Sequence, residues 1–194
     1  MTPLASIATA RLVLRASNPA FADAVAEFYR RNQAAHACWN PPLPAAMFTV
    51  EGQQERLGDA AIAATAGGAI SWWLFAPDTP SMALGQIHFS QIARRVFHNA
   101  MLGYAIDAAH EGQGLMREAL EAALEDAFGP RVQLHRVQAN VRPENIRSLA
   151  LLMRLGFERE GLAREYLFID GAWRDHVMTA RINPDWAADQ APPT

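Results

Sequence analysis

Apolar positions recur along this chain in two different periods, and the changes between them predict the order of its elements. A period of two, or a short apolar run, is typical of a strand, whereas apolar residues three and four positions apart are typical of a helix. The pattern predicts strands at 11–15, 70–76, 82–92, 101–106, 134–141, 157–169 and 173–181. It predicts helices at 19–35, 49–66, 115–128 and 145–155. This order indicates an α/β fold in which helices flank a mixed sheet.

Turn-forming residues separate several of these elements. The segment 77–80 carries two prolines between two predicted strands, and Asp170-Gly171 favours a tight hairpin turn. The proline-rich segment 39–44 predicts a loop. We see no repeat and no break in composition, so residues 1–186 are predicted to form one domain. Residues 187–194, which include two prolines, are predicted to form a flexible tail.

Composition and charge narrow the class of protein. A chain of 194 residues with 51% hydrophobic and 19% charged residues is typical of a globular domain with a full core. A formal net charge of −3 implies no general affinity for nucleic acid. The single cysteine, Cys38, excludes an internal disulfide, and no apolar run reaches the roughly 18 residues of a membrane span. We therefore expect a cytoplasmic protein, either monomer or homodimer, that binds neither nucleic acid nor membranes.

The junction between the strand at 101–106 and the helix at 115–128 is the strongest functional signal. It reads Glu111-Gly112-Gln113-Gly114-Leu115-Met116. Gly112 and Gly114 permit a tight turn and leave room for a ligand against the main chain. The helix that follows begins with free N–H groups and the positive end of its dipole. These features predict an anion site, most often for phosphate, although plain strand-to-helix turns also use such glycines.

The loop differs from two common phosphate-binding motifs. It lacks the Gly-Lys-Ser/Thr ending of a P-loop, and it lacks the third glycine of a dinucleotide fingerprint. With these two motifs excluded, the loop is predicted to bind a pyrophosphate through main-chain groups alone. Coenzyme A is a common ligand that is bound in this way. The spacing of cysteines and histidines does not suggest a metal site, so we predict CoA and no metal.

The residues around this loop resemble the GNAT superfamily of N-acetyltransferases. The segment 102–106, Leu-Gly-Tyr-Ala-Ile, followed by 111–116, is similar to a motif that usually reads Gln/Arg-x-x-Gly-x-Gly/Ala. Further similar segments lie at 135–140, 145–148, 154–161, 166–171 and 173–176. Their order and spacing are similar to the RimJ/RimL family, and within it to the ribosomal-protein-alanine N-acetyltransferases. The resemblance covers roughly the whole chain and is loose between 16 and 83.

The resemblance implies a GNAT fold with acetyl-CoA as co-substrate. The strand at 134–141 would diverge from the strand at 101–106 and open a slot for pantetheine. The implied cofactor-binding residues are Leu102, Tyr104, Ile106, Gly112, Gln113, Gly114, Leu115, Met116, Arg117 and Asn145.

Two positions depart from the usual motif, since Glu111 replaces Gln or Arg and Met116 replaces Gly or Ala. Glu111 places a carboxylate beside the predicted pyrophosphate, so its side chain must point away from it to avoid like-charge repulsion.

Acetyl transfer needs a neutral amine, two positioned substrates and a proton for the departing thiolate. The resemblance implies Ser148 as the proton donor near the CoA sulfur. The residues also allow a plainer interpretation, in which Asn145 caps a helix and Ser148 occupies its first turn. The general base stays unassigned, and a water relay is also possible; the candidates are His88, His98, His110, Glu111 and His135.

The acceptor is less constrained than the cofactor. The resemblance implies transfer to the α-amino group of a protein that begins with Ala or Ser, with a ribosomal protein as partner. The segments Trp39–Pro42 and Trp72-Trp73 are candidate contacts for a peptide end, although we favour a rigid loop and a hydrophobic core. Two alternatives are a small-molecule amine acetyltransferase and a non-catalytic CoA-binding module, which Glu111 slightly supports.

Overall fold

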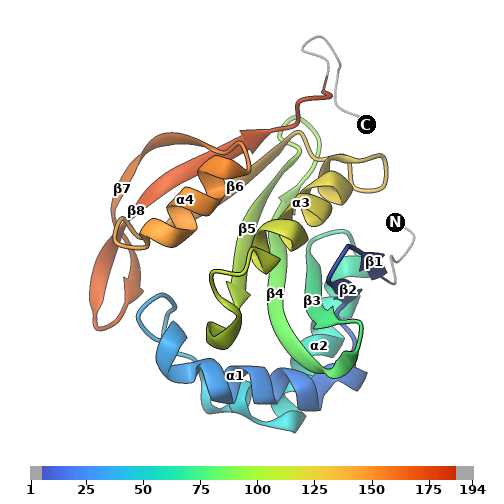
Figure 1. Cartoon of the computed structure of the whole chain (residues 1–194). Helices are drawn as coiled ribbons and strands as arrows, with labels where there is room; N and C mark the ends of the chain where they lie inside the picture. The colour runs from blue at the N-terminus through green and yellow to red at the C-terminus, as the bar shows by residue number, and fades with distance from the viewer. Residues whose placement is uncertain (1–5, 187–194) are drawn as a thin grey trace.

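The computed structural model describes residues 6–186 and shows one mixed sheet with helices on both faces (Figure 1). The strands lie in the order β1-β2-β3-β4-β5-β6-β8-β7. They are β1 Ser6–Ala8, β2 Val13–Ala16, β3 Ile70–Ala76, β4 Thr79–Ala93, β5 Asn99–Ile106, β6 Arg136–Val141, β7 Glu158–Ile169 and β8 Ala172–Ile182. Among these strands β5 and β6 pair in parallel and the other neighbours are antiparallel, which confirms the predicted α/β class with a mixed sheet.

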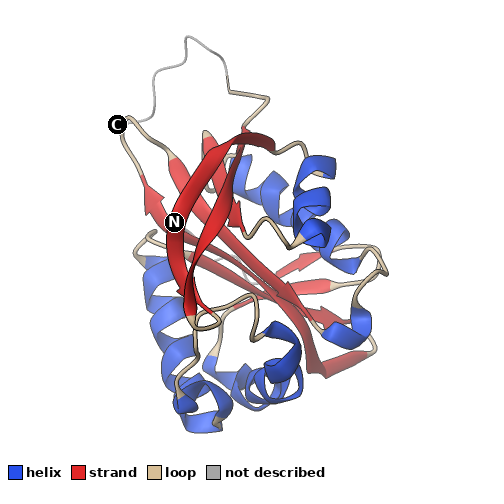
Figure 2. Cartoon of the chain, turned by 90° about the vertical axis from the view of Figure 1, so that its left-hand side faces the viewer, coloured by secondary structure: helices blue, strands red, loops and turns tan. Residues whose placement is uncertain are grey.

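The helices form two layers, one on each side of the sheet (Figure 2). The α-helices are α1 Ala22–His36, α2 Val50–Thr65, α3 Leu115–Phe128 and α4 Ile146–Arg154, and short 3-10 turns lie at Pro19–Phe21, Ala45–Phe48 and Ala108–His110. One hydrophobic core lies between the sheet and α3 and α4, and a second lies between the sheet and α1 and α2. None of the helices within residues 6–186 is long and apolar enough to cross a membrane.

Two neighbouring tryptophans show how β3 serves both cores. Side chains alternate between the faces of a strand, so consecutive residues point in opposite directions. Trp72 packs into the core beneath α3, whereas Trp73 packs edge-on against Phe28 of α1 with ring centroids 5.7 Å apart. Both rings are almost completely buried. The interpretation of Trp72-Trp73 as core is therefore confirmed, and the pair is not a peptide-binding surface.

All predicted strands and helices are present, and several of them begin or end one to three residues from the predicted positions. β3 and α3 have the predicted bounds. The three-residue strand β1 was not predicted, because so short a segment shows no period. The predicted turn at 77–80 is shorter than expected, since Thr79 already pairs with Ala76 at the start of β4. The predicted tail at 187–194 lies outside the described residues.

The sheet opens between β5 and β6. These strands share ladder pairs only from Asn99↔Arg136 to Met101↔Gln138. β5 continues along β4 as far as Ile106, and β6 continues along β8 as far as Val141. Beyond Met101, the edge of β5 that faces β6 has no strand partner within residues 6–186. The predicted divergence of these two strands is confirmed.

Candidate active site

The loop that leads into α3 has the conformation that its glycines predict. Gly112 and Gly114 have φ angles of 73° and 77°, in the left-handed region that favours glycine. A Cβ built on Gly112 would meet nothing within 4 Å, so space is open beside the main chain there. α3 begins directly after Gly114, and the amides of its first turn have no intrahelical partner. The loop therefore offers main-chain donors and open space to an anion.

The side chain of Arg11, which precedes β2, contacts both this loop and α3. Its Nη1 donates to the carbonyl of Gln113 at 3.0 Å, and its Nε forms an ion pair with Glu118 of α3 at 2.7 Å. Thr9 donates to the same carboxylate at 2.6 Å. Sequence reasoning placed Arg11 in a strand and missed this role, because its partners lie more than a hundred residues away along the chain.

The first residues of α3 turn their apolar side chains into the core. Leu115 and Met116 are both buried in the core. Arg117 is exposed, and its Nε pairs with Glu121 at 2.8 Å. Because the Met116 side chain points into the core, its departure from the small residue of the usual motif leaves the ligand side of the loop unobstructed.

Glu111 has a counter-charge that sequence reasoning did not anticipate. Its carboxylate forms an ion pair with Arg147 in the first turn of α4. The pair joins the first residue of the loop at 111–114, here called the phosphate loop, to the helix that follows β6. Arg147 therefore offsets the negative charge that Glu111 places near the predicted pyrophosphate.

A pair of hydroxyl groups connects the two halves of the sheet on the α3 and α4 side. Tyr104 of β5 and Ser148 of α4 have their hydroxyl oxygens 2.6 Å apart. Burial raises the pKa of Tyr104 to about 12, although the hydrogen bond with Ser148 acts in the opposite direction. Tyr104 is therefore neutral at physiological pH and can donate to the Ser148 oxygen.

Asn145 caps α4. Its Oδ1 accepts a hydrogen bond from the Ser148 main-chain N–H at 3.1 Å. This confirms the capping interpretation for Asn145 and places Ser148 in the first turn. The capping bond uses the amide oxygen and the Ser148 main chain, so the Ser148 hydroxyl keeps its contact with Tyr104.

Two of the base candidates lie away from the opening. His98 and His135 contact the ring of Trp186, with centroids 5.4 and 5.3 Å away. They precede the first residues of β5 and β6, at the end where these strands are still paired. His98 and His135 are therefore placed away from the opening, because β5 and β6 pair at their first residues and separate toward their last ones.

The other two histidine candidates are already engaged. His88 Nδ1 lies 2.5 Å from the Ser71 hydroxyl, and burial lowers the pKa of His88, with a further contribution from Arg56. His110 Nδ1 lies 3.3 Å from the carboxylate of Asp107. Neither contact identifies a general base, so that role stays unassigned.

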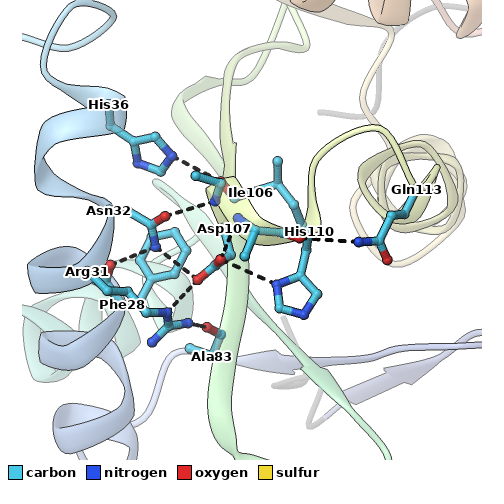
Figure 3. A network of polar contacts seen from close by, with 11 residues as sticks. Phe28, Arg31, Asn32, His36, Ala83, Ile106, Asp107, His110 and Gln113 are labelled. Carbon is cyan, nitrogen blue, oxygen red and sulfur yellow. Dashed lines mark hydrogen bonds and ion pairs between the residues drawn. The ribbon is translucent and has the colours of Figure 1, made fainter.

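A buried polar network lies where β5 ends (Figure 3). Asp107 is 3% exposed and accepts hydrogen bonds from Arg31 and Asn32 of α1, from the Ala109 main chain and from His110. Burial alone would raise the pKa of Asp107, but these hydrogen bonds lower it to about 2. Asp107 is therefore ionised across the physiological range. The network fixes the turn that leads into the phosphate loop.

The β7–β8 hairpin carries an irregularity beside the open half of β6. The ladder shifts register between Ala163 and Leu167, and an open hollow of about 700 Å³ there is lined by Arg164, Glu165 and Asp175. The Tyr166 hydroxyl accepts from Asn140 of β6 at 3.0 Å. Sequence reasoning missed this hollow, because a bulge depends on how two strands pair. Within residues 6–186 no cluster of side chains suits a metal ion.

Comparison with known proteins agrees with this geometry. The sequence profile of the acetyltransferase (GNAT) domain matches residues 11–158. The [ribosomal protein uS5]-alanine N-acetyltransferase of Escherichia coli (strain K12) is 42% identical over 185 residues, which cover 95% of this chain and 94% of that protein.

Two solved structures have the same architecture. The ribosomal-protein-S5-alanine acetyltransferase from Vibrio fischeri superposes with a TM-score of 0.88 at 33% identity, covering 94% of this chain and 98% of that one. Mycobacterium smegmatis RimJ in complex with CoA-disulfide superposes with a TM-score of 0.82 at 28% identity, covering 93% of this chain and 85% of that one.

Proposed function

The chain belongs to the GNAT family of acetyltransferases, and from this premise we propose that it acetylates the α-amino group of a ribosomal protein that begins with Ala or Ser. As a member of this family it is an N-acetyltransferase that uses acetyl-CoA. The observation that carries the choice of acceptor is the 42% identity, over 95% of the chain, to an enzyme named for a ribosomal-protein alanine. The similarity spans the acceptor-side elements as well as the phosphate loop.

The cofactor site combines two parts of the β5–β6 region. The unpaired edge of β5 after Met101 offers main-chain N–H and C=O groups to the pantetheine amides. The pantetheine would then pair with β5 as an additional strand does. The loop from Gly112 to Gly114 and the first turn of α3 offer main-chain N–H groups to the pyrophosphate. The open space beside Gly112 fits such a ligand, since a side chain there would occupy it.

The proposed chemistry needs one proton donor at the slot. The amine nitrogen attacks the thioester carbonyl carbon, the C–S bond breaks, and the sulfur takes a proton. The hydroxyl oxygens of Tyr104 and Ser148 lie 2.6 Å apart, and either can be the donor. In the proposed mechanism Tyr104 donates to Ser148 Oγ, so that the Ser148 proton is available to the sulfur. The amine loses its own proton to water or to a base that we leave unassigned.

The acceptor is proposed to be an α-amine because of its ionisation. An α-amino group has a pKa of about 7.7–8.0, so a useful fraction is neutral at pH 7, whereas a lysine with a pKa of about 10.4 is almost fully charged. The loop after α1 lies at the open end of the slot, where the Cys38 carbonyl accepts from Arg142 and the Trp39 ring lies beneath the same guanidinium. We propose that this loop contacts the first residue of the peptide and favours a small one.

Competing peptides test the proposal. We expect an Ala- or Ser-led peptide with an internal lysine to be acetylated at its N-terminus and not at the lysine, as mass spectrometry would show. The same peptide led by Leu or Glu should react much more slowly. Lysine acetylation with a bare N-terminus would overturn the proposed acceptor. Transfer to polyamines or aminoglycosides, with none to any peptide, would favour the small-molecule alternative.

A further inference from the structure

The separation of β5 and β6 at the slot is not set by the sheet ladder. Their pairing ends at Met101↔Gln138, and each strand then follows a different neighbour. On the α3 and α4 side, the hydroxyl pair Tyr104–Ser148 spans the opening. At the open end, a second connection runs through α1 and the residues that follow it.

The first end of this connection is anchored to β5. Arg31 donates to the Asp107 carboxylate and to the Ala83 carbonyl of β4. Asn32 makes two contacts, since its Nδ2 donates to Asp107 at 3.1 Å and its Oδ1 accepts from the Ala108 main chain at 2.9 Å. In Figure 3 these side chains project from one side of α1 toward the end of β5.

His36, one turn further along α1, reaches the strand itself. Its Nε2 lies 3.0 Å from the carbonyl oxygen of Ile106, the last residue of β5. A main-chain carbonyl can only accept, so the Nε2 atom carries the proton in this contact. The final turn of α1 is thereby fixed to the open end of β5.

The other end of the connection is anchored beyond β6. Arg142, which directly follows β6, is only 9% exposed, and its Nη1 donates to the Cys38 carbonyl at 2.5 Å. Its guanidinium lies 5.5 Å from the centroid of the Trp39 ring. The intervening residues are stiffened locally, since the Trp39 N–H and the Asn40 Nδ2 both bond to the His36 carbonyl.

We infer that residues 31–39, here called the α1 strut, hold the open ends of β5 and β6 at the separation that acetyl-CoA requires, with Asp107 and Arg142 as positioning residues at its two anchors. This inference rests on the proposed function, because it concerns the same slot. A ligand that bonds to one strand edge and to a neighbouring loop is sensitive to small displacements between them. The strut also borders the acceptor side, so it bears on both substrates.

Three variants and a matched control test the strut. Asp107→Asn keeps the side-chain size but leaves Arg31 without its buried counter-charge. Arg142→Met keeps an apolar side chain beside Trp39 but loses the bond to Cys38 and the ion pair with Glu144. The control is Asp126→Asn, which breaks another partly buried ion pair, with Arg131, at the far end of α3. The third variant, His36→Phe, keeps ring packing against Phe28 and loses only the contact with Ile106.

Calorimetric titration with CoA is the first readout. We expect the dissociation constant to rise about tenfold in Asp107→Asn and in Arg142→Met, and to stay unchanged in Asp126→Asn at a comparable loss of thermal stability. The Asp107→Asn, Arg142→Met double variant should bind little more weakly than either single variant, because both substitutions weaken the same connection between β5 and β6. The acceptor KM should rise in the same variants.

The outcomes separate this inference from the proposed function. Additive losses in the double variant would mean two independent contacts and would overturn the strut. Unchanged CoA affinity in both single variants would overturn it as well, and if Asp107→Asn does not fold, unchanged affinity in His36→Phe has the same meaning. A wild-type protein that binds no CoA would instead refute the proposed function.

Discussion

In the proposed mechanism Ser148 gives up its proton to the CoA sulfur, while the neighbouring Tyr104 hydroxyl donates a hydrogen bond to its oxygen. Burial raises the Tyr104 pKa to about 12, so the Tyr104 hydroxyl stays protonated over the working range of pH and can donate in this pair. The pair is 2.6 Å apart and lies where β5 and α4 approach each other across the opening. This gives Ser148 an orientation that a helix first turn alone does not provide.

Removing either hydroxyl tests the proton transfer. We expect Ser148→Ala to lower kcat by about 10²-fold with little change in acetyl-CoA affinity, because the contact matters mainly in the transition state. Tyr104→Phe should lower kcat by less, since Ser148 keeps its proton. Rapid-quench kinetics under conditions where chemistry is rate-limiting would measure this. A wild-type kcat in Ser148→Ala would show that Ser148 has only a structural role in α4.

Asp107 makes the free energy of unfolding depend on pH in the acid range. Its pKa is about 2 in the folded protein, against an ordinary value of 3.8, so the folded state favours the ionised form. A depressed carboxyl pKa contributes stability that is present above the unfolded value and is lost as pH falls through the folded value. The difference corresponds to about 2 kcal/mol.

Urea unfolding of the wild type and of Asp107→Asn measures this contribution. The difference in unfolding free energy between the two proteins should be constant from pH 7 to pH 5 and should shrink between about pH 4 and pH 2. A difference that stays constant down to pH 2.5 would mean that Asp107 titrates normally in the folded state.

Single residues also show where prediction from sequence ends. The left-handed glycines at 112 and 114 were predictable, because the turn depends on neighbouring residues. The Asp107 network was not, since its α1 partners Arg31 and Asn32 lie 76 and 75 residues away along the chain. The same holds for Arg147 opposite Glu111, a pairing that exists only once α4 has packed.

At the scale of elements, the loop at 111–114, the proposed phosphate loop, has the backbone conformation that is hardest for other residues to adopt. Its second glycine must hold a left-handed conformation immediately before α3 and must also leave the ligand side clear. The glycine after α4, Gly156, has a nearly equal φ of 79°, and a Cβ there would meet its nearest neighbour at 3.7 Å, against 3.6 Å at Gly114. A side chain at either position should therefore strain the backbone to a similar extent, but only Gly114 lies in the proposed phosphate loop.

This similarity supplies a matched pair of substitutions. Gly114→Ala and Gly156→Ala should each lose about 1 kcal/mol of stability, because an alanine is strained at positive φ. We expect only Gly114→Ala to weaken CoA binding, by tenfold or more. Isothermal titration together with urea unfolding would show both effects. Equal CoA affinity in the two variants would place the phosphates away from this loop.

Helices and strands were predicted most accurately where the segment is long and its apolar positions recur regularly. α3 was predicted with its observed bounds because seven of its apolar residues, at helical spacing, are buried in one core. β1 was missed because three residues show no period, and β4 began earlier than predicted because Pro80 was interpreted as part of a turn. The strand divergence came from family resemblance, since periodicity contains no information on pairing.

At the scale of the whole molecule, the described chain is a sheet in two halves joined by a short parallel ladder and by the contacts across the opening. The antiparallel half from β1 to β5 and the half formed by β6, β8 and β7 each keep their own pairing to the end of the slot. We propose that CoA bound between β5 and β6 contacts both halves. Binding should therefore oppose their separation during unfolding.

Thermal denaturation with acetyl-CoA tests this expectation for the molecule as a whole. A ligand that binds only the folded state adds about 2.7 kcal/mol at a hundredfold excess over its dissociation constant. For a protein of this size that corresponds to a rise in Tm of about 5–10 °C. Gly114→Ala should need a proportionally higher acetyl-CoA concentration for the same rise, whereas Gly156→Ala should respond as the wild type does. An unchanged Tm at millimolar acetyl-CoA would contradict a CoA site between β5 and β6.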